Sequence, residues 1–450
     1  MTPTTHAIPR RLLAALAAGG GGAEAIRRLR DAERSRTRLL IHDLVQRAAA
    51  VRHPHAAVTR RAFDILAEVE RDRSDVVAGL LSYPPVAAWA VHTVRALHGP
   101  HHAAGNPAFL AAVTAVAAQR AGAETVLDVP GHPDGNRYLA LPGLGWFEAP
   151  ASGSVRVHTG GSPDGEGLVV GGVAARLHDT DRVRAVHGSL RLEAYLDVAA
   201  WHHALGTRFC AVRGVVESGV DCGLWRDRLA AAWDLLGEHH REIARELAEG
   251  LAAVVPLAAP PDRSASSSLA GAFGAVAMSV PPGPRGAALA LVHEMQHSKF
   301  AALARLYPLV TEEPATRYYA PWRPDPRPLT ALLDGTYAFV AVARFWRTQR
   351  LVDTDASARY EAETNFRRWT RAGHDVAAML RQHPALTPMG TFLSTGMLDV
   401  LRRWSGEPVS QQAAVAARAL AEEHLSQWRR SHSRTSGPSS TSMLAECPSK

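Results

Sequence analysis

Cysteine is scarce in this chain, and none of its 450 residues lie in a long apolar run. Three cysteines are too few for a disulfide scaffold, and the absence of any Cys-x-x-Cys pair argues against a thiolate zinc site. Because no run of about 18 apolar residues exists, we expect no transmembrane helix. The apolar content of 46% and the charged content of 21% are ordinary for globular proteins and exclude a mainly disordered or fibrous chain.

The formal net charge is +7, and nearly all of the positive charge is arginine. A dense basic block would indicate a nucleic-acid or acidic-peptide partner. Here the arginines are spread along predicted helices, so we interpret them as solvated helix faces. We therefore expect no nucleic-acid partner.

The amino terminus resembles a signal peptide in part, because Arg10 and Arg11 precede a short apolar stretch at residues 12–18. That stretch is only about 7 residues long, at the lower limit for a signal peptide. It also continues into an arginine-rich helical pattern at residues 26–50. We interpret it as the first helix of the working protein, and we expect a cytoplasmic location.

The patterns predict an α+β fold that is mainly helical, with a small antiparallel β region. Short β-like runs alternate with Gly, Pro and Asp turns only after residue 121, and apolar periodicity is lost after residue 429. We therefore divide the chain into four regions. These are a helical amino-terminal region (1–121), a β-rich region (122–213), a helical catalytic region (214–429) and a disordered tail (430–450).

The third region carries the most specific pattern. We predict a helix over residues 224–257, a loop over 264–268 and a short apolar strand over 273–280, followed by helices over 286–307 and 329–351. The strand precedes the helix at 286–307 as the edge strand does in zincin-like folds. We therefore predict a metal-binding helix with an adjacent edge strand.

That helix contains His293-Glu294-Met295-Gln296-His297, an H-E-x-x-H motif. Residues four apart share one face of a helix, so the two imidazoles can bind one metal ion. Two histidines with one carboxylate suit non-haem Fe(II), and the same set suits catalytic zinc. His293 and His297 are therefore the predicted metal ligands.

A third ligand must come from elsewhere, because the G-x-x-H extension of the metzincins is missing after His297. We choose Asp334, which lies on the predicted helix 329–351 in line with apolar residues. A carboxylate on an apolar face is costly unless it meets a cation or hydrogen-bond donors. Glu313, in the loop between the two helices, is the second choice, and His374 is a weaker one.

The proline-rich loop at residues 319–328 presents two arginines. An arginine fork binds a carboxylate bidentately, so it could hold the distal carboxylate of a 2-oxo diacid cosubstrate. Arg323 is our first candidate for this role and Arg327 our second; pairing with Asp325 is the structural alternative. Lys299 lies two residues after His297 and therefore points away from the metal face.

Three segments together resemble the HExxH-type peptide β-hydroxylase family. They are the motif, residues 321–328 (Pro-Trp-Arg-Pro-Asp-Pro-Arg-Pro) and residues 332–339 (Leu-Leu-Asp-Gly-Thr-Tyr-Ala-Phe). The resemblance spans roughly residues 8–428, with the specific motifs between 273 and 346. It implies an enzyme that uses Fe(II) and 2-oxoglutarate to hydroxylate a β-carbon of a residue in a ribosomally synthesised precursor peptide.

The same resemblance implies that His293 and His297 bind the iron. Members of the family accompany radical-SAM maturases, and the present chain has no radical-SAM cysteine triad. We therefore expect a stand-alone enzyme that works beside a separate maturase and binds the precursor peptide against the strand at 273–280. Glu294 is then a catalytic-site residue that holds a hydrogen bond.

Two other interpretations stay open. The chain could be a zinc metallopeptidase in which Glu294 is the general base that activates water. It could also be a peptide-binding module without enzymatic activity, in which the motif is structural and binds no stoichiometric metal.

Overall fold

The computed structural model describes most of the chain. The described residues are 6–100, 105–131, 138–148, 153–160, 168–174, 178–179, 182–196, 198–206, 210, 214–216, 220–258, 264–269, 271–433 and 444–445. Helices dominate, and several small sheets accompany them, as predicted. None of the helices in these ranges is long and apolar enough to cross a membrane.

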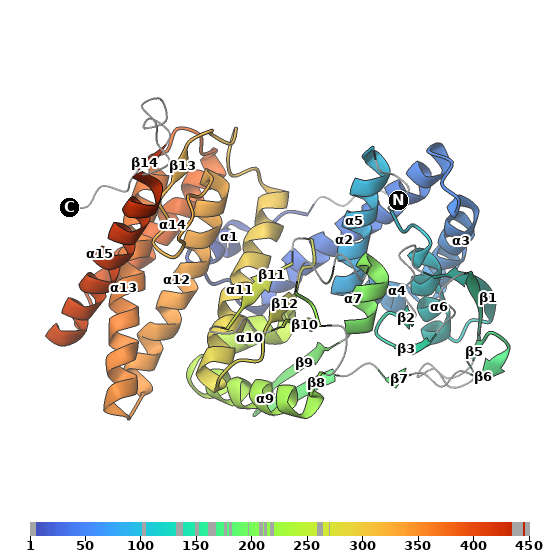
Figure 1. Ribbon diagram of the computed structural model, residues 1–450, viewed down its shortest axis with the longest axis horizontal. Coiled ribbons are helices and arrows are strands. Elements are labelled where there is room, and N and C mark those ends of the chain that lie inside the picture. The colour runs from blue at the N-terminus through green and yellow to red at the C-terminus, as the bar shows by residue number, and fades with distance from the viewer. Residues whose placement is uncertain are drawn as a thin grey trace.

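The amino-terminal part of the chain is helical, as the pattern predicts. Its helices are α1 (Arg10–Ala17), α2 (Gly22–Ala50), α3 (Ala56–Asp72), α4 (Ser74–Leu81), α5 (Pro84–His98) and α6 (Phe109–Ala121). Helix α6 is buried over almost its whole length, which explains why it is apolar on every side. Figure 1 places α3 to α6 at one end of the molecule, together with the first antiparallel strands.

The predicted antiparallel β region is present, but its strands are divided among three sheets, of which two lie wholly within it. The first has the order β1-β4-β5-β6 and contains β1 (Thr125–Pro130), β4 (Ser154–Thr159), β5 (Val169–Val170) and β6 (Val173–Ala174). The second has the order β2-β3-β7 and contains β2 (Tyr138–Leu141), β3 (Gly145–Glu148) and β7 (His178–Asp179). Leu127 of β1 and Val157 of β4 form a cross-strand pair, and both side chains are buried.

A third sheet lies in the middle of the molecule and is mixed, with the order β11-β12-β10-β9-β8. Its strands are β8 (Arg182–His187), β9 (Leu190–Tyr195), β10 (Ala253–Pro256), β11 (Ser266–Ser268) and β12 (Ala275–Met278). Strand β10 runs parallel to both β12 and β9, whereas β11 is antiparallel to β12. This sheet therefore takes strands from both sides of residue 213, and helix α7 (Val198–Leu205) lies between them in the chain.

Two predictions in this part of the chain are wrong. The predicted helix 224–257 ends early, because residues 253–256 form β10, whose side chains are buried on both faces. A fully buried strand is a short continuous apolar run, which periodicity does not separate from helix. The predicted strand at 273–280 forms β12, but β12 is an inner strand. The edge strand next to β12 is β11, within the segment predicted as a loop, and β8 forms the opposite edge.

The carboxyl-terminal helices are α9 (Cys222–His239), α10 (Arg241–Gly250), α11 (Pro284–Leu306), α12 (Leu329–Val352), α13 (Ala356–Arg381), α14 (Pro388–Ser405) and α15 (Gln411–Ser433). Of these, α12 to α15 lie at the other end of the molecule and α9 to α11 lie in the middle, beside the mixed sheet (Figure 1). Helices α11 and α12 confirm the predicted helices within a few residues. The short strand β13 (Arg317–Tyr318) pairs in parallel with β14 (Leu444–Ala445), and the rest of the predicted tail beyond Ser433 lies outside the described residues.

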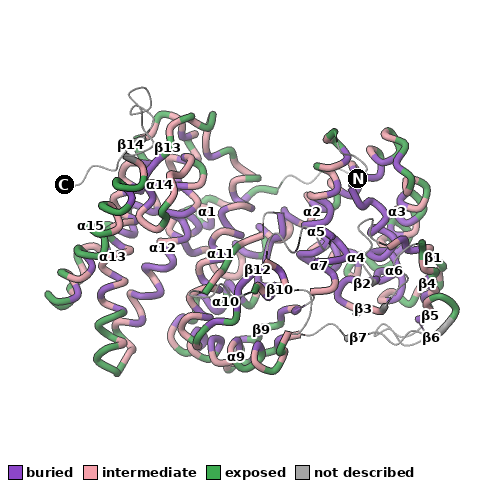
Figure 2. Tube along the Cα trace, viewed as in Figure 1, coloured by how far each residue is buried: buried purple, intermediate pink, exposed green. Residues whose placement is uncertain are grey.

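Helix α2 joins two hydrophobic cores. Ile26 and Leu29, near its beginning, pack into the core around α9 to α14, whereas Ile41 and Leu44 pack into the core around α3 to α6. Figure 2 shows buried residues continuing through both parts of the molecule. The long helix therefore connects the two ends of the fold.

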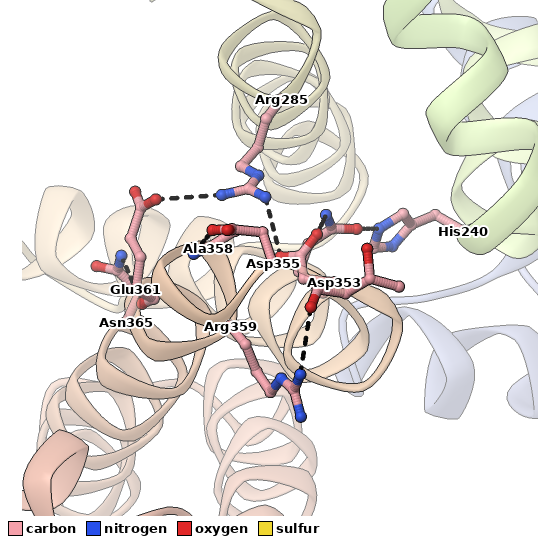
Figure 3. A network of polar contacts seen from close by, with 10 residues as sticks. His240, Arg285, Asp353, Asp355, Ala358, Arg359, Glu361 and Asn365 are labelled. Carbon is pink, nitrogen blue, oxygen red and sulfur yellow. Dashed lines mark hydrogen bonds and ion pairs between the residues drawn. The ribbon is translucent and has the colours of Figure 1, made fainter.

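A line of polar contacts holds the beginning of α11 in place (Figure 3). Arg285 pairs with Asp353 at 3.0 Å and with Glu361 at 3.1 Å. Gln349 donates to the other oxygen of Asp353 at 3.2 Å and accepts from Nε2 of His240 at 2.8 Å. Helix α11 is thereby fixed to α12, to α13 and to the junction between α9 and α10.

Candidate metal centre

The two motif histidines converge on one point. His293 and His297 lie on the same face of α11, and their Nε2 atoms are 3.1 Å apart. Two nitrogen ligands bound at about 2.0–2.1 Å to one metal ion, at angles near 90–110°, lie about 2.9–3.4 Å from each other. The spacing therefore fits two ligands of a single metal ion.

Asp334 orients one of these rings. Its Oδ1 atom accepts a hydrogen bond from Nδ1 of His297 at 2.8 Å, so the proton sits on Nδ1 and the lone pair of Nε2 points toward His293. Metal-binding histidines commonly use a carboxylate in this way. Burial alone lowers the pKa of His297, but the hydrogen bond and charge of Asp334, with the charge of Glu294, raise it above its ordinary value.

His293 is held in the neutral form. Burial, with a smaller contribution from the nearby His297, lowers the pKa of His293 to about 3. Its ring meets the edge of Phe339 at a centroid distance of 5.4 Å. Since neutral imidazole is the form that binds metal ions, His293 is ready to bind, whereas the raised pKa of His297 means that a metal ion must displace its proton.

No third protein ligand joins the pair among the described residues, where no group of three or more His, Cys, Asp or Glu side chains is placed to hold a metal ion. Asp334 was predicted for that role, but it contacts the outer nitrogen of His297 instead. Glu313 accepts hydrogen bonds from the backbone N–H and hydroxyl of Thr330 at the start of α12. His374 bonds its neighbour Asp375 on α13.

Glu294 lies between the histidines and the edge strand. It is only 3% exposed, and its Oε1 atom is 3.9 Å from Nε2 of His293. That oxygen accepts a hydrogen bond from Ser266 at 2.7 Å, and the carboxylate also accepts one from the backbone N–H of Ser268. Burial raises the pKa of Glu294, although His297 and Ser266 oppose the rise. The carboxylate therefore ties α11 to β11.

The proline-rich loop packs on α12 next to this centre. Trp322 stacks on Phe339 with 4.7 Å between ring centroids and 16° between planes. A Cβ atom at Gly335 would lie 2.5 Å from the indole nitrogen of Trp322, so only glycine permits this contact. The residue after Asp334 thus determines where the loop sits.

The two predicted arginines share one carboxylate. Asp325 accepts from Arg323 through Oδ1 and from Arg327 through Oδ2, both at 2.9 Å. Burial raises the pKa of Asp325, but these hydrogen bonds hold it below its ordinary value. The Arg323 side chain is 52% exposed and that of Arg327 is 33% exposed. The charge of Arg327 also opposes protonation of His297. Arg327, the second candidate for binding the cosubstrate, therefore acts electrostatically on one of the two motif histidines.

A cleft of about 360 Å³ opens beside His293. Its aromatic residues, Phe339 and Trp369, and Ser266 on β11 were not predicted as site residues from the sequence. A signal for Phe339 existed, because Gly335, Phe339 and Val342 share one face of α12 at helical spacing. Trp369 comes from α13, whose packing on α12 only the tertiary structure reveals.

No protein-family model and no curated protein matches the chain. The resemblance to the HExxH-type peptide β-hydroxylases therefore rests on the three sequence segments, and the candidate metal centre rests on its geometry.

Proposed function

We propose that this protein is a 2-oxoglutarate- and Fe(II)-dependent oxygenase that hydroxylates a β-carbon in a ribosomally synthesised precursor peptide. The observation that supports it most is the 3.1 Å separation of the two Nε2 atoms beside a cleft of substrate size. We further propose that it works in the cytoplasm and alongside a separate radical-SAM maturase.

The residues fit an iron ion in part. His293 and His297 would hold it, because their Nε2 atoms lie 3.1 Å apart on one helix face and Asp334 fixes the ring of His297. Bound Fe(II) supplies oxidation of a C–H bond by dioxygen, with 2-oxoglutarate as the second reductant. A metal held by two protein nitrogens leaves room for the oxo acid and for oxygen.

The arginine loop provides the charge that the cosubstrate requires. The distal carboxylate of 2-oxoglutarate would bind the guanidinium of Arg323 or Arg327, both of which pair with Asp325 in this structure. Arg327 is the better placed of the two, since its charge acts on His297. Bidentate contact with a guanidinium would orient the diacid.

The peptide would lie along the edge strand. Because β11 ends the sheet, one of its sides has no strand partner among the described strands. An extended segment can add there through backbone hydrogen bonds. Glu294 would then act as a positioning residue, since its carboxylate holds Ser266 and Ser268 of this strand.

The second candidate function is a zinc metallopeptidase. It is favoured by the position of Glu294, whose Oε1 lies 3.9 Å from Nε2 of His293 and whose pKa is raised by burial. In that case Glu294 would take a proton from a metal-bound water. The peptidase offers no role for the two arginines.

Anaerobic loading with Fe(II) and 2-oxoglutarate tests the proposal. We expect a weak visible charge-transfer band that is lost in His293→Ala and kept in His239→Ala, a control histidine on α9. A protein that shows no band and retains zinc tightly would contradict the hydroxylase. Glu294→Gln gives a second criterion, because it should abolish peptide cleavage but leave the charge-transfer band.

A further inference from the structure

The cleft beside His293 is built from five elements, β11, β12, α11, α12 and α13, and the loops next to them. The end of β12 and the segment before α11 contribute Met278, Pro281 and Pro282, and α11 contributes Leu289. Helix α12 adds Phe339 and Val342, and α13 adds Trp369. His293, on α11, is in the same lining. Whatever enters the cleft is therefore next to a motif histidine.

No charged side chain lines this cleft in the described part of the protein. The remaining lining residues are small or hydroxyl-bearing, namely Ser264, Ala265, Ser266, Ser279, Gly286 and Ala290. A carboxylate or ammonium group that entered would lose its hydration without gaining an opposite charge. An apolar group would instead gain from leaving water.

Two of the three serine hydroxyls in the lining, those of Ser266 and Ser279, are already engaged. Ser266 donates to Glu294 at 2.7 Å, and Ser279 accepts from the backbone N–H of Ala265 at 2.9 Å. These bonds hold β11 to β12 and to α11. These two hydroxyls therefore hold the walls of the cleft together and have little capacity left for a polar ligand.

One wall is a fixed group of aromatic rings. Phe339 lies between Trp322, stacked at 4.7 Å, and Trp369, tilted at 4.6 Å. It also faces the ring of His293 at 5.4 Å. Rings that support one another in this way form a preorganised surface for a second apolar or aromatic group.

We propose that this cleft selects the residue that is modified, and that it accepts an uncharged apolar side chain of branched-aliphatic or aromatic size. This inference rests on the proposed function for its catalytic meaning. The peptide backbone would follow β11, and the side chain that fills the cleft would bring its own β-carbon close to His293. Peptides with Leu, Ile, Val or Phe at that position are the substrates this geometry favours.

Binding of capped pentapeptides Gly-Thr-Xaa-Thr-Gly to the full-length, metal-free protein tests the inference. With ligand-observed NMR, we expect Xaa = Phe or Leu to bind at least about 10-fold more tightly than Xaa = Asp or Lys. Equal or tighter binding of the charged peptides would overturn the inference.

Two variants connect the preference to the cleft. Leu289→Asp should weaken binding of the Phe peptide by about 10-fold and strengthen binding of the Lys peptide. Leu351→Asp, at an exposed leucine of α12, should change the affinity for neither peptide. Trp369→Ala should also weaken binding of the Phe peptide by about 10-fold. This variant tests the same cleft if Leu289→Asp fails to fold. An unchanged preference in folded Leu289→Asp or Trp369→Ala would place recognition elsewhere.

The two proposals can fail separately. Because the binding assay uses no metal, the peptide preference is measured independently of iron chemistry. A charge-transfer band without an apolar preference would refute only the selectivity. An apolar preference without a band would keep the cleft as a peptide site and refute the hydroxylase.

Discussion

Oδ1 of Asp334 lies 2.8 Å from Nδ1 of His297, while Nε2 of the same ring lies 3.1 Å from His293. The carboxylate therefore acts on the pair of motif histidines by a hydrogen bond to the outer nitrogen of one imidazole. This arrangement fixes the orientation of the ring and its tautomer before any metal arrives. It accounts for a carboxylate on a largely apolar helix without making that carboxylate a ligand.

Replacing Asp334 should weaken metal binding without abolishing it. Asp334→Asn removes the charge that supports His297, so we expect the affinity for Fe(II) or Co(II) to fall about 10- to 100-fold. His293→Ala should remove the site. Competition with a chromophoric chelator under anaerobic conditions measures both effects.

Asp234→Asn is the matched control, because it removes another carboxylate from the Nδ1 atom of a histidine, His187, on the surface. It should leave metal affinity unchanged. A loss in Asp334→Asn as complete as in His293→Ala would show that Asp334 binds the metal directly.

The contact between Trp322 and Gly335 should be sensitive to a single methyl group. In Gly335→Ala the new Cβ would lie 2.5 Å from the indole nitrogen, so Trp322 must leave its stack on Phe339. We expect the free energy of unfolding to fall by about 1–3 kcal/mol and the near-ultraviolet circular dichroism to change. Under the proposed function, affinity for 2-oxoglutarate should fall as well, because the loop carries the two arginines proposed to bind it, Arg323 and Arg327.

Gly79→Ala is the control for this change, since an added Cβ on α4 meets nothing within 4 Å. It should leave stability unchanged or raise it by up to about 1 kcal/mol. Equal behaviour of the two alanine variants in urea denaturation would argue against the predicted clash.

The buried ion pair between Lys299 and Glu246 should be essential as a pair. Lys299 is fully buried, and its Nζ donates to Glu246 at 2.7 Å and to the carbonyl of Gly19 at 3.3 Å. Glu246 also accepts from the backbone of Gly22 at 2.9 Å, so the pair anchors the α1–α2 turn. Lys299→Met leaves a buried carboxylate alone and should cost about 3–5 kcal/mol.

Adding Glu246→Gln to Lys299→Met should recover most of that loss, because the amide keeps an acceptor for Gly22 and removes the charge. Arg11→Met, which breaks an exposed pair with Glu24, should change stability far less. Urea denaturation of the four proteins gives the comparison. A double variant no more stable than Lys299→Met would contradict the argument.

His240 should make the fold sensitive to mild acid. Burial lowers the pKa of His240 to about 4, against a smaller raising effect of its hydrogen bond to Gln349. Between about pH 6.5 and pH 4 the unfolded chain therefore binds a proton that the folded protein does not, and stability falls as the pH falls. The loss reaches about 3 kcal/mol by pH 4 and then levels off.

His240→Asn keeps a donor for Gln349 but removes the titration. Urea denaturation at pH 7 and at pH 5 should show a smaller acid-dependent loss in this variant than in the unsubstituted protein. His239→Asn, at the neighbouring and more exposed histidine, should keep the full loss. Identical pH dependence in all three proteins would exclude His240 as the source.

Local features were predictable because they depend on residues close in the chain. The spacing of His293 and His297 places both rings on one helix face, and the periodicity around them predicted α11. The same reasoning predicted α12 and correctly turned Lys299 away from the metal face. It failed at β10, since a fully buried strand of four apolar residues carries no period of its own.

Only the tertiary structure decided how these elements meet. It made β11 and not β12 the edge of the sheet, because edge position follows from which strands pair. In the folded protein, Asp334 accepts a hydrogen bond from Nδ1 of His297, and Asp325 accepts hydrogen bonds from both loop arginines. Trp369, from α13, packs against Phe339 of α12. These contacts join residues from different elements, and their geometry follows from helix packing and strand order. The sequence by itself determined a two-histidine motif on a helix, and packing determined the surroundings of that motif.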